Sequence, residues 1–222
     1  MRILILLLSL ALFTSCSKDS PLSNSLPGSN DKDPGVEPIS ALAFKVVGDY
    51  SGNTWRSEWT QFIFNSLDEQ SSGLLENEIN LADLSVINCL KFNSLSRNEK
   101  KMFWALFMSS ISHFESSFNP NERYWERSMR KYSEGLFQLS TSDSNYYSYC
   151  NVDSSNILDP EENISCAVSI LDIQIEGSSR REPGRLFPTS YFYWSVLTRD
   201  TTRVKVQKFF KERVSEHLPF CS

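Results

Sequence analysis

The chain has 222 residues, with 22 Lys and Arg against 27 Asp and Glu and a net charge of −5 at pH 7. This acidic balance argues against a nucleic-acid-binding protein, because such proteins carry a basic surface for the phosphates. Once the terminal segments described next are set aside, roughly 180 residues remain, which predicts one domain with room for a substantial core.

The N-terminus has the pattern of an export signal. Arg2 precedes an apolar run over residues 3–13, which has the length of a secretory core and is shorter than the roughly 20 residues that a membrane span needs. The run ends in L-F-T-S-C, where small residues stand before Cys16. We predict a signal peptide at residues 1–15 and lipid attachment at Cys16. The alternative is an ordinary secretory signal in which this cysteine is incidental.

A lipid on Cys16 would anchor the exported protein in a membrane. Ser17 follows it, and in lipoproteins of this kind serine at that position favours the outer membrane, facing the periplasm. Residues 16–38 are rich in Ser, Pro, Asp, Asn and Gly and cannot bury enough apolar surface to offset their ordering entropy. We therefore predict a flexible tether at 16–38 and a folded domain at 39–222, which we expect to be monomeric.

The other four cysteines are Cys89, Cys150, Cys166 and Cys221. An even number in an oxidising compartment predicts two disulfides. Of the three possible pairings, we favour Cys150–Cys166 as a local bridge and Cys89–Cys221 as a long closure. Buried free thiols are the alternative.

Helical periodicity dominates the chain after the tether. Apolar residues recur at helical spacing over 55–68, and a shorter apolar segment covers 81–90. Residues 96–99 read S-R-N-E, which is a capping box and predicts the start of a helix that runs to about Phe114. That helix is apolar on nearly every side, so it should be the buried central helix of the domain.

The second half of the chain mixes turns and helices. We predict a polar loop from Pro120 to about Lys131 and a turn-rich segment over 133–158. A helix follows over 159–177, with an aspartate cap, proline in its first turn and glycine at its end. A short aromatic helix at 191–197 and an amphipathic helix at 202–217 complete a mostly α-helical fold.

Metal and nucleophile motifs are missing from the sequence. The two histidines, His113 and His217, stand outside any HExxH pattern, and there is no CxxC pair, GxSxG or GxGxxG. A zinc hydrolase is therefore disfavoured. A Cys–His catalytic pair is also disfavoured, because the cysteines are expected in disulfides. We expect neither a metal nor a cofactor.

Glu115 is the candidate catalytic acid. It lies on the last turn of the most apolar helix, where the unpaired carbonyls and the negative end of the helix dipole disfavour a carboxylate. Apolar neighbours add desolvation, so its pKa should be raised. A glycosidase needs such a carboxyl, still protonated near neutral pH, to protonate the leaving oxygen. The alternative is a surface acid at a helix end.

Two motifs give this residue a context. Residues 115–120 read E-S-S-F-N-P, and residues 133–140 read S-E-G-L-F-Q-L-S. Together they resemble the lytic transglycosylase and goose-type lysozyme superfamily, whose patterns are E-S-x-F-N-P and S-x-G-L-M-Q-I. The resemblance covers roughly residues 99–197. It implies a lysozyme-like α-helical domain with a buried central helix and a substrate cleft.

The same resemblance assigns roles to individual residues. Glu115 would be the sole acid/base, Ser133 would orient it, and Gln138 would bind the N-acetyl or hydroxyl groups of the sugar. Gly135 and Ser140 would belong to the same substrate-binding wall. The family has a tyrosine near the end of the domain in an A-Y-N-A-G pattern. Tyr193 is our candidate, although the neighbouring glycine is absent.

The implied activity is cleavage of the β-1,4 bond between N-acetylmuramic acid and N-acetylglucosamine in peptidoglycan, leaving 1,6-anhydromuramic ends. Two alternatives stay open. One is a lysozyme-like hydrolase of the same bond, including one selective for modified peptidoglycan, in which Asp143 would position water. The other is a peptidoglycan-binding lipoprotein without catalysis. Asp143 is also readily explained as a turn acid beside two serines.

Three further groups have two interpretations each. Tyr146, Tyr147 and Tyr149 could stack on sugars or cover helix ends. Arg180, Arg181 and Arg185 could meet peptide carboxylates, although a solvated basic loop is favoured. Glu134 occupies the variable position of the second motif, so we expect it to face solvent.

Overall fold

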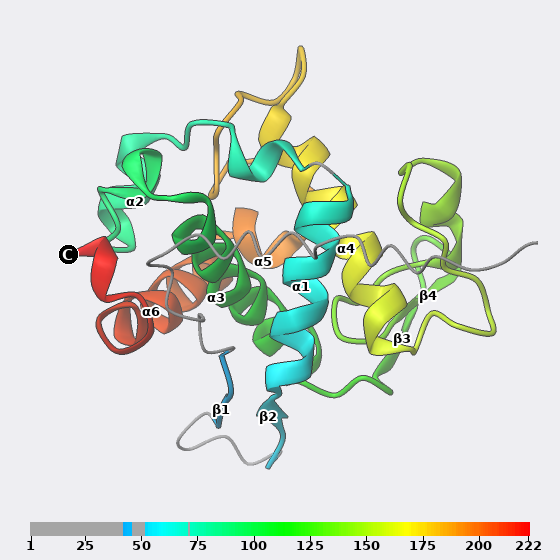
Figure 1. Ribbon diagram of the computed structural model, residues 1–222. Coiled ribbons are helices and arrows are strands. Elements are labelled where there is room, and N and C mark those ends of the chain that lie inside the picture. Colours follow the sequence, from blue (N-terminus) through cyan, green and yellow to red (C-terminus); the bar gives the residue numbers. More distant parts are fainter. Residues whose placement is uncertain (1–41, 46–51, 71) are drawn as a thin grey trace, which may run out of the picture. The chain divides into compact units, whose positions relative to one another are not determined.

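The computed structural model describes residues 42–45, 52–70 and 72–222 (Figure 1). The predicted signal peptide, Cys16 and the tether at 16–38 lie outside these residues. In the described part of the chain the secondary structure comprises six α-helices, four short strands and four 3-10 turns. None of these helices is long and apolar enough to cross a membrane.

Helix α3 (Arg97–Ser116) is the centre of the fold. It begins at the predicted capping box, in which the backbone N–H of Ser96 donates to Glu99 at 2.8 Å and the Ser96 hydroxyl accepts from the Glu99 N–H. Residues 102–112 are buried without a break, as expected for a helix that is apolar all round. The sequence-based prediction of a mostly helical, lysozyme-like fold with a buried central helix is confirmed.

Several of the other helices pack against α3. Helix α1 contacts both α3 and α4, while α6 contacts α3 and the short α5 (Figure 1). Their bounds are α1 Ser57–Glu69, α2 Leu81–Val86, α4 Pro160–Glu176, α5 Ser195–Thr198 and α6 Asp200–His217. The inward side chains of α6 are the four that its amphipathic pattern predicts: Val206, Phe209, Phe210 and Val214.

Two β-hairpins were not predicted. Strands β1 (Phe44–Lys45) and β2 (Thr54–Trp55) form one, and β3 (Arg123–Glu126) and β4 (Lys131–Glu134) form the other. We expected a polar loop as far as Lys131, so this prediction is wrong for β3. Strands β3 and β4 are short, and the loop between them, residues 127–130, has no glycine or asparagine to signal a hairpin. Arg130 takes the left-handed conformation there, with φ of 52°.

The aromatic segment near residue 191 is also less helical than predicted. Tyr191 has φ of 59°, and Trp194 is extended at the start of α5, which begins only at Ser195. Contacts with the rest of the domain override helix propensity here: the backbone N–H of Tyr193 donates to the side-chain oxygen of Gln174 at 2.9 Å.

Disulfides join Cys89 to Cys221 and Cys150 to Cys166, the two favoured pairs. All four cysteines are buried. The first bridge ties the chain end after α6 to the segment before α3, and the second ties α4 to the turn before it.

Candidate active site

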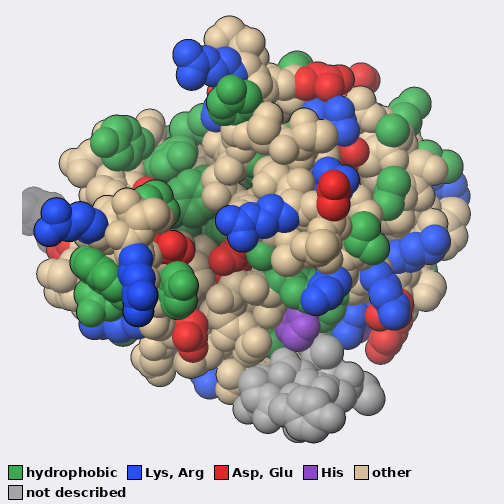
Figure 2. Space-filling model, turned by 180° about the vertical axis from the view of Figure 1, so that it is seen from behind, with side chains coloured by type: hydrophobic (Ala, Val, Ile, Leu, Met, Phe, Trp, Pro, Cys, Tyr) green, Lys and Arg blue, Asp and Glu red, His purple; other side chains and the backbone are tan. Residues whose placement is uncertain are grey.

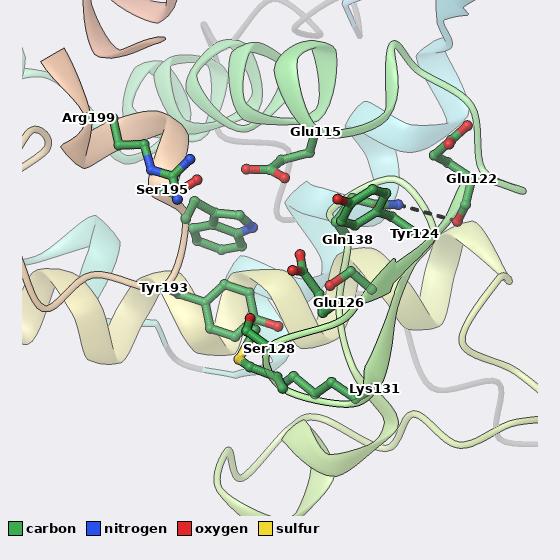
Figure 3. A pocket seen from close by; sticks show the side chains of 13 residues that line it. Glu115, Glu122, Tyr124, Glu126, Ser128, Lys131, Gln138, Tyr193, Ser195 and Arg199 are labelled. Carbon is green, nitrogen blue, oxygen red and sulfur yellow. Dashed lines mark hydrogen bonds between the residues drawn. The ribbon is translucent and has the colours of Figure 1, made fainter. Parts of the chain in front are cut away.

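A pocket of about 560 Å³ lies where α3 ends, the β3–β4 hairpin stands and the chain enters α5 (Figure 3). In the opposite view, acidic side chains lie in a hollow of the surface, with basic side chains near its rim (Figure 2). The lining residues are Glu115, Glu122, Tyr124, Glu126, Ser128, Met129, Lys131, Ser133, Gln138, Tyr193, Trp194, Ser195 and Arg199.

The end of α3 points Glu115 into this pocket (Figure 3). The helix stops because Ser117 and Phe118 both take positive φ angles, 50° and 60°. The hydroxyl of Ser116 donates to the carbonyl of Leu136 at 2.9 Å. The E-S pair of the first motif therefore has a structural basis: the serine joins the helix end to the second motif, and the preceding glutamate is held at the junction.

The surroundings of Glu115 raise its pKa to about 7. Burial is the largest cause, because desolvation penalises the charged carboxylate. The negative charge of Glu126 acts in the same direction, and the positive charge of Arg199 opposes both. The raised pKa agrees with the sequence-based expectation, but Glu126 is a cause that the sequence did not suggest.

Asn163 on α4 holds the second motif in place. Its amide nitrogen donates to the carbonyls of Glu134 and Ile157 at 3.1 and 2.8 Å, and its oxygen accepts from the N–H of Phe137 at 3.0 Å. Gly135 has φ of 78°, and a Cβ there would lie 2.4 Å from the Asn163 amide nitrogen. The glycine is thus required by backbone shape and close packing.

Gln138 lines the pocket with its amide already oriented. Its nitrogen donates to the carbonyls of Gly135 and Glu122 at 3.0 and 3.3 Å. Both partners are acceptors, so the amide orientation is defined and the side-chain oxygen is the atom available to a ligand. Ser133 also lines the pocket, but within the described residues it makes no hydrogen bond to Glu115. Neither Gly135 nor Ser140 is among the lining residues.

Tyr193 forms another wall, anchored by Asp143. The Tyr193 hydroxyl donates to the Asp143 carboxylate at 2.5 Å, and the same carboxylate oxygen accepts from the backbone N–H of Ser140 at 2.8 Å. Burial and the Asp143 charge raise the pKa of Tyr193. Asp143 is buried and does not line the pocket. It therefore behaves as a turn acid just after the second motif, and its carboxylate is not presented to the pocket.

Sequence reasoning missed Glu126, Lys131 and Arg199 as pocket residues. Glu126 and Lys131 face each other across the β3–β4 hairpin, so only a correct strand assignment could have placed them on one face. Arg199 stands between α5 and α6 and belongs to no motif.

The structure corrects the prediction that Glu134 faces solvent. Glu134 is buried rather than solvated, and its carboxylate lies 3.1 Å from Arg123 across the hairpin. Other candidates lie outside the pocket lining. Arg185 pairs with Asp83 at 2.9 Å instead, and Tyr146, Tyr147, Tyr149, Arg180 and Arg181 are also absent from the lining. Across the described residues, no group of three or more His, Cys, Asp or Glu is arranged to hold a metal ion.

Comparisons with known proteins agree with this geometry. A family model, the transglycosylase SLT domain, matches residues 93–184. That match includes Glu115 and the second motif but not Tyr193 or Arg199. No curated protein gives a significant match.

Among solved structures, Bd0314 DslA wild-type form 2 is 30% identical with a TM-score of 0.60, covering 79% of this chain and 94% of that one. Two glutamate-to-glutamine mutants of Bd0314 DslA are also similar. One is 27% identical and the other 28%, both with a TM-score of 0.59; they cover 79% and 77% of this chain and 94% of their own.

Proposed function

The chain belongs to the transglycosylase SLT domain family, and from that premise we propose that it cleaves the β-1,4 bond between N-acetylmuramic acid and N-acetylglucosamine in peptidoglycan. Glu115 is the proposed acid/base. One observation carries this assignment: its carboxyl lies in the pocket with a pKa raised to about 7. A carboxyl in that state is protonated often enough near neutral pH to act as an acid and ionised often enough to act next as a base.

The proposed reaction needs no external water. Glu115 protonates the glycosidic oxygen, and the bond to the muramic acid C1 breaks with a transition state of oxocarbenium character. The resulting carboxylate then removes the proton from the muramic acid 6-hydroxyl, whose oxygen bonds to C1. The products are a shortened strand with a 1,6-anhydro end and a free 4-hydroxyl on the leaving strand, and Glu115 regains its proton.

Four other residues receive roles in this proposal. The side-chain oxygen of Gln138 accepts a hydrogen bond from the N–H of an N-acetyl group. Tyr193 and Tyr124 form apolar walls for the sugar rings. Ser133 lies on strand β4 of the hairpin and orients Glu115 once the substrate has displaced solvent. Support comes from their common lining of the pocket (Figure 3).

Hydrolysis of the same bond is the second candidate, and Glu126 favours it. A second carboxylate in the pocket could activate a water, as in glycosidases that use two acids. Figure 3 shows the side chain of Glu126 pointing into the pocket across from Glu115. The two glutamates replaced in the Bd0314 DslA mutants stand eleven positions apart in that protein. Glu115 and Glu126 have the same separation.

Product analysis separates the two reactions. The full protein is incubated with purified sacculi, and the released fragments are analysed by mass spectrometry. We expect 1,6-anhydromuramic ends, which weigh one water less than the reducing ends that hydrolysis would leave. Reducing ends alone would contradict the non-hydrolytic mechanism and establish the second candidate.

Glu115→Gln tests catalysis itself. It should reduce release by at least about 100-fold, the contribution typical of a general acid, without lowering the melting temperature. Unchanged release would exclude Glu115 as the acid. No release from sacculi by the wild-type protein, with binding retained, would support the non-catalytic peptidoglycan-binding alternative.

We also propose that the protein is exported and anchored in the outer membrane through lipid on Cys16, facing the periplasm. The lipobox-like pattern before Cys16 supports this. Cys16→Ser should move the protein from the membrane fraction to the soluble periplasmic fraction and abolish incorporation of labelled fatty acid. Membrane association that is unaffected by this substitution would contradict lipid anchoring.

A further inference from the structure

The β3–β4 hairpin has two faces, and only one of them belongs to the pocket. Successive side chains of a strand point to opposite sides. Tyr124 pairs with Ser133 and Glu126 with Lys131 across the hairpin, and all four of these residues line the pocket. The intervening residues must therefore present the opposite surface.

That opposite surface, which we call the outer face, carries an exposed aromatic pair. Trp125 and Tyr132 are cross-strand partners with ring centroids 4.9 Å apart and an angle of 61° between the planes. Their side chains remain 45% and 50% exposed. Two large aromatic side chains held together and left in water cost solvation free energy, which is the usual sign of a contact surface.

The loop that joins the two strands is basic. Arg127 and Arg130 stand at its two ends, are exposed and are absent from the pocket lining, and neither forms an ion pair with any described residue. Neither acid of the hairpin neutralises these arginines: Glu134 pairs with Arg123, and Glu126 points into the pocket. The loop at the end of the outer face thus has an excess of positive charge in a chain whose net charge is −5.

We infer that the outer face is a second contact surface for peptidoglycan, which binds the acidic stem peptides next to the strand being cut. This inference rests on the proposed function. Guanidinium groups pair with carboxylates in a planar, two-pronged geometry, and the stem peptides supply carboxylates. The aromatic pair packs against the aliphatic parts of the same peptide. The occupant follows from charge complementarity and from position: the same two strands line the pocket in which the glycan is proposed to lie, and the stem peptides branch from that glycan.

Binding to intact sacculi tests this surface without digestion. All proteins carry Glu115→Gln, and the fraction retained on sacculi is measured against sacculus concentration. Arg127→Gln combined with Arg130→Gln should weaken retention by about tenfold at low salt, and the difference should shrink as salt screens the charges. The matched control is Lys205→Gln with Lys211→Gln, which removes the same charge from exposed positions on α6. It should bind as the parent does.

Peptide-free glycan strands identify the ligand. After an amidase has removed the stem peptides, the Arg127/Arg130 variant and its parent should bind equally. A defect that persists on these strands would overturn the assignment to peptides, and so would equal binding to intact sacculi. If the variant lost binding to phosphatidylglycerol vesicles but not to sacculi, the surface would be a membrane contact instead.

Activity measurements keep this inference separate from the proposed function. With Glu115 intact, the Arg127/Arg130 variant should retain its kcat/KM on short peptide-free glycan fragments. Trp125→Ala provides a second variant, whose defect on sacculi should be insensitive to salt. A fully active Glu115→Gln enzyme would defeat the proposed catalysis. Normal sacculus binding by both outer-face variants would defeat only the second surface.

Discussion

Glu115 lies between two charges that act on it in opposite directions. Glu126 raises its pKa, Arg199 lowers it, and burial adds the largest upward contribution, so that the pKa reaches about 7. For a general acid, kcat/KM requires the protonated form in the free enzyme. Activity should therefore fall as pH rises through about 7, because the fraction of protonated Glu115 decreases there.

Substitution of Glu126 or Arg199 should change the pH at which activity falls, which is the alkaline limb of the pH profile. Glu126→Gln removes a negative charge, lowers the pKa of Glu115 and shifts the limb to lower pH. Arg199→Gln removes a positive charge and shifts it to higher pH. The measurement is kcat/KM on soluble glycan fragments between pH 5 and 9 in low salt, since salt screens both charges. Equal shifts in the same direction would contradict the electrostatic assignment. Loss of all activity in Glu126→Gln would instead indicate a direct role in catalysis.

Asp143 is a positioning residue that acts through Tyr193. The hydroxyl of Tyr193 donates to the Asp143 carboxylate, and a hydrogen bond to a charged group contributes about 1.5–3 kcal/mol. Asp143→Asn and Tyr193→Phe should each reduce kcat/KM by roughly 10-fold, mainly by raising KM, because the wall of the pocket loosens.

The double variant separates this pairing from general damage. Tyr193→Phe removes the donor of this hydrogen bond, whereas Asp143→Asn removes only the charge that strengthens it. Because both changes act on the same hydrogen bond, Asp143→Asn combined with Tyr193→Phe should be little worse than Tyr193→Phe alone. Tyr146→Phe is the control, because that side chain is 75% exposed and outside the pocket lining. Additive losses in the double variant would mean that the two residues act independently.

At the scale of elements, the helices were predictable and the hairpins were not. The capping box at Ser96 and the aspartate–proline start at Asp159 are local signals, so α3 and α4 begin where the sequence indicates. The β3–β4 hairpin lacks such a signal. Its strands mix charged and aromatic side chains without an apolar face, because one face lines the pocket and the other is exposed, and its left-handed loop residue is Arg130. Two pocket residues, Glu126 and Lys131, were missed for this reason.

Asn163 shows how one element positions another. It is fully buried on α4 and satisfies three backbone groups around the second motif. Asn163→Ala would leave these groups without partners, at a cost of about 1–3 kcal/mol each before relaxation. We expect a loss of about 3 kcal/mol or more in unfolding free energy, together with lower activity because Gln138 moves.

Chemical denaturation and activity assays of the same preparation measure both effects of this substitution. The control, Asn65→Ala, removes an exposed side-chain hydrogen bond on α1 and should change stability by less than about 0.5 kcal/mol. If Asn163→Ala were as stable as the control, the role given to α4 in holding the motif would be wrong.

Over the whole molecule, the two disulfides have different tasks. Cys89–Cys221 spans 132 positions and encloses both motifs, whereas Cys150–Cys166 spans 16 and joins α4 to the turn before it. Both pairs could be proposed from the sequence, because an even cysteine number and spacing leave few alternatives. The contribution of each disulfide to activity could not be predicted from the sequence, because it depends on which parts of the fold the bridge holds together.

The two variants that each lack one disulfide should rank in one order by loss of stability and in the opposite order by loss of activity. Loop-closure entropy predicts a loss of about 5 kcal/mol for Cys89→Ala with Cys221→Ala and about 3 kcal/mol for Cys150→Ala with Cys166→Ala. All four sites are buried, so cavity costs are similar and the difference reflects loop length. Cys166 lies one turn from Asn163 on α4, so loss of the shorter bridge should disturb the second motif more. We therefore expect the variant that lacks the Cys150–Cys166 bridge to be the more stable of the two in urea. Under conditions where both variants are folded, it should be the less active on soluble glycan. The reverse ranking in activity would mean that α4 holds the motif without help from this bridge.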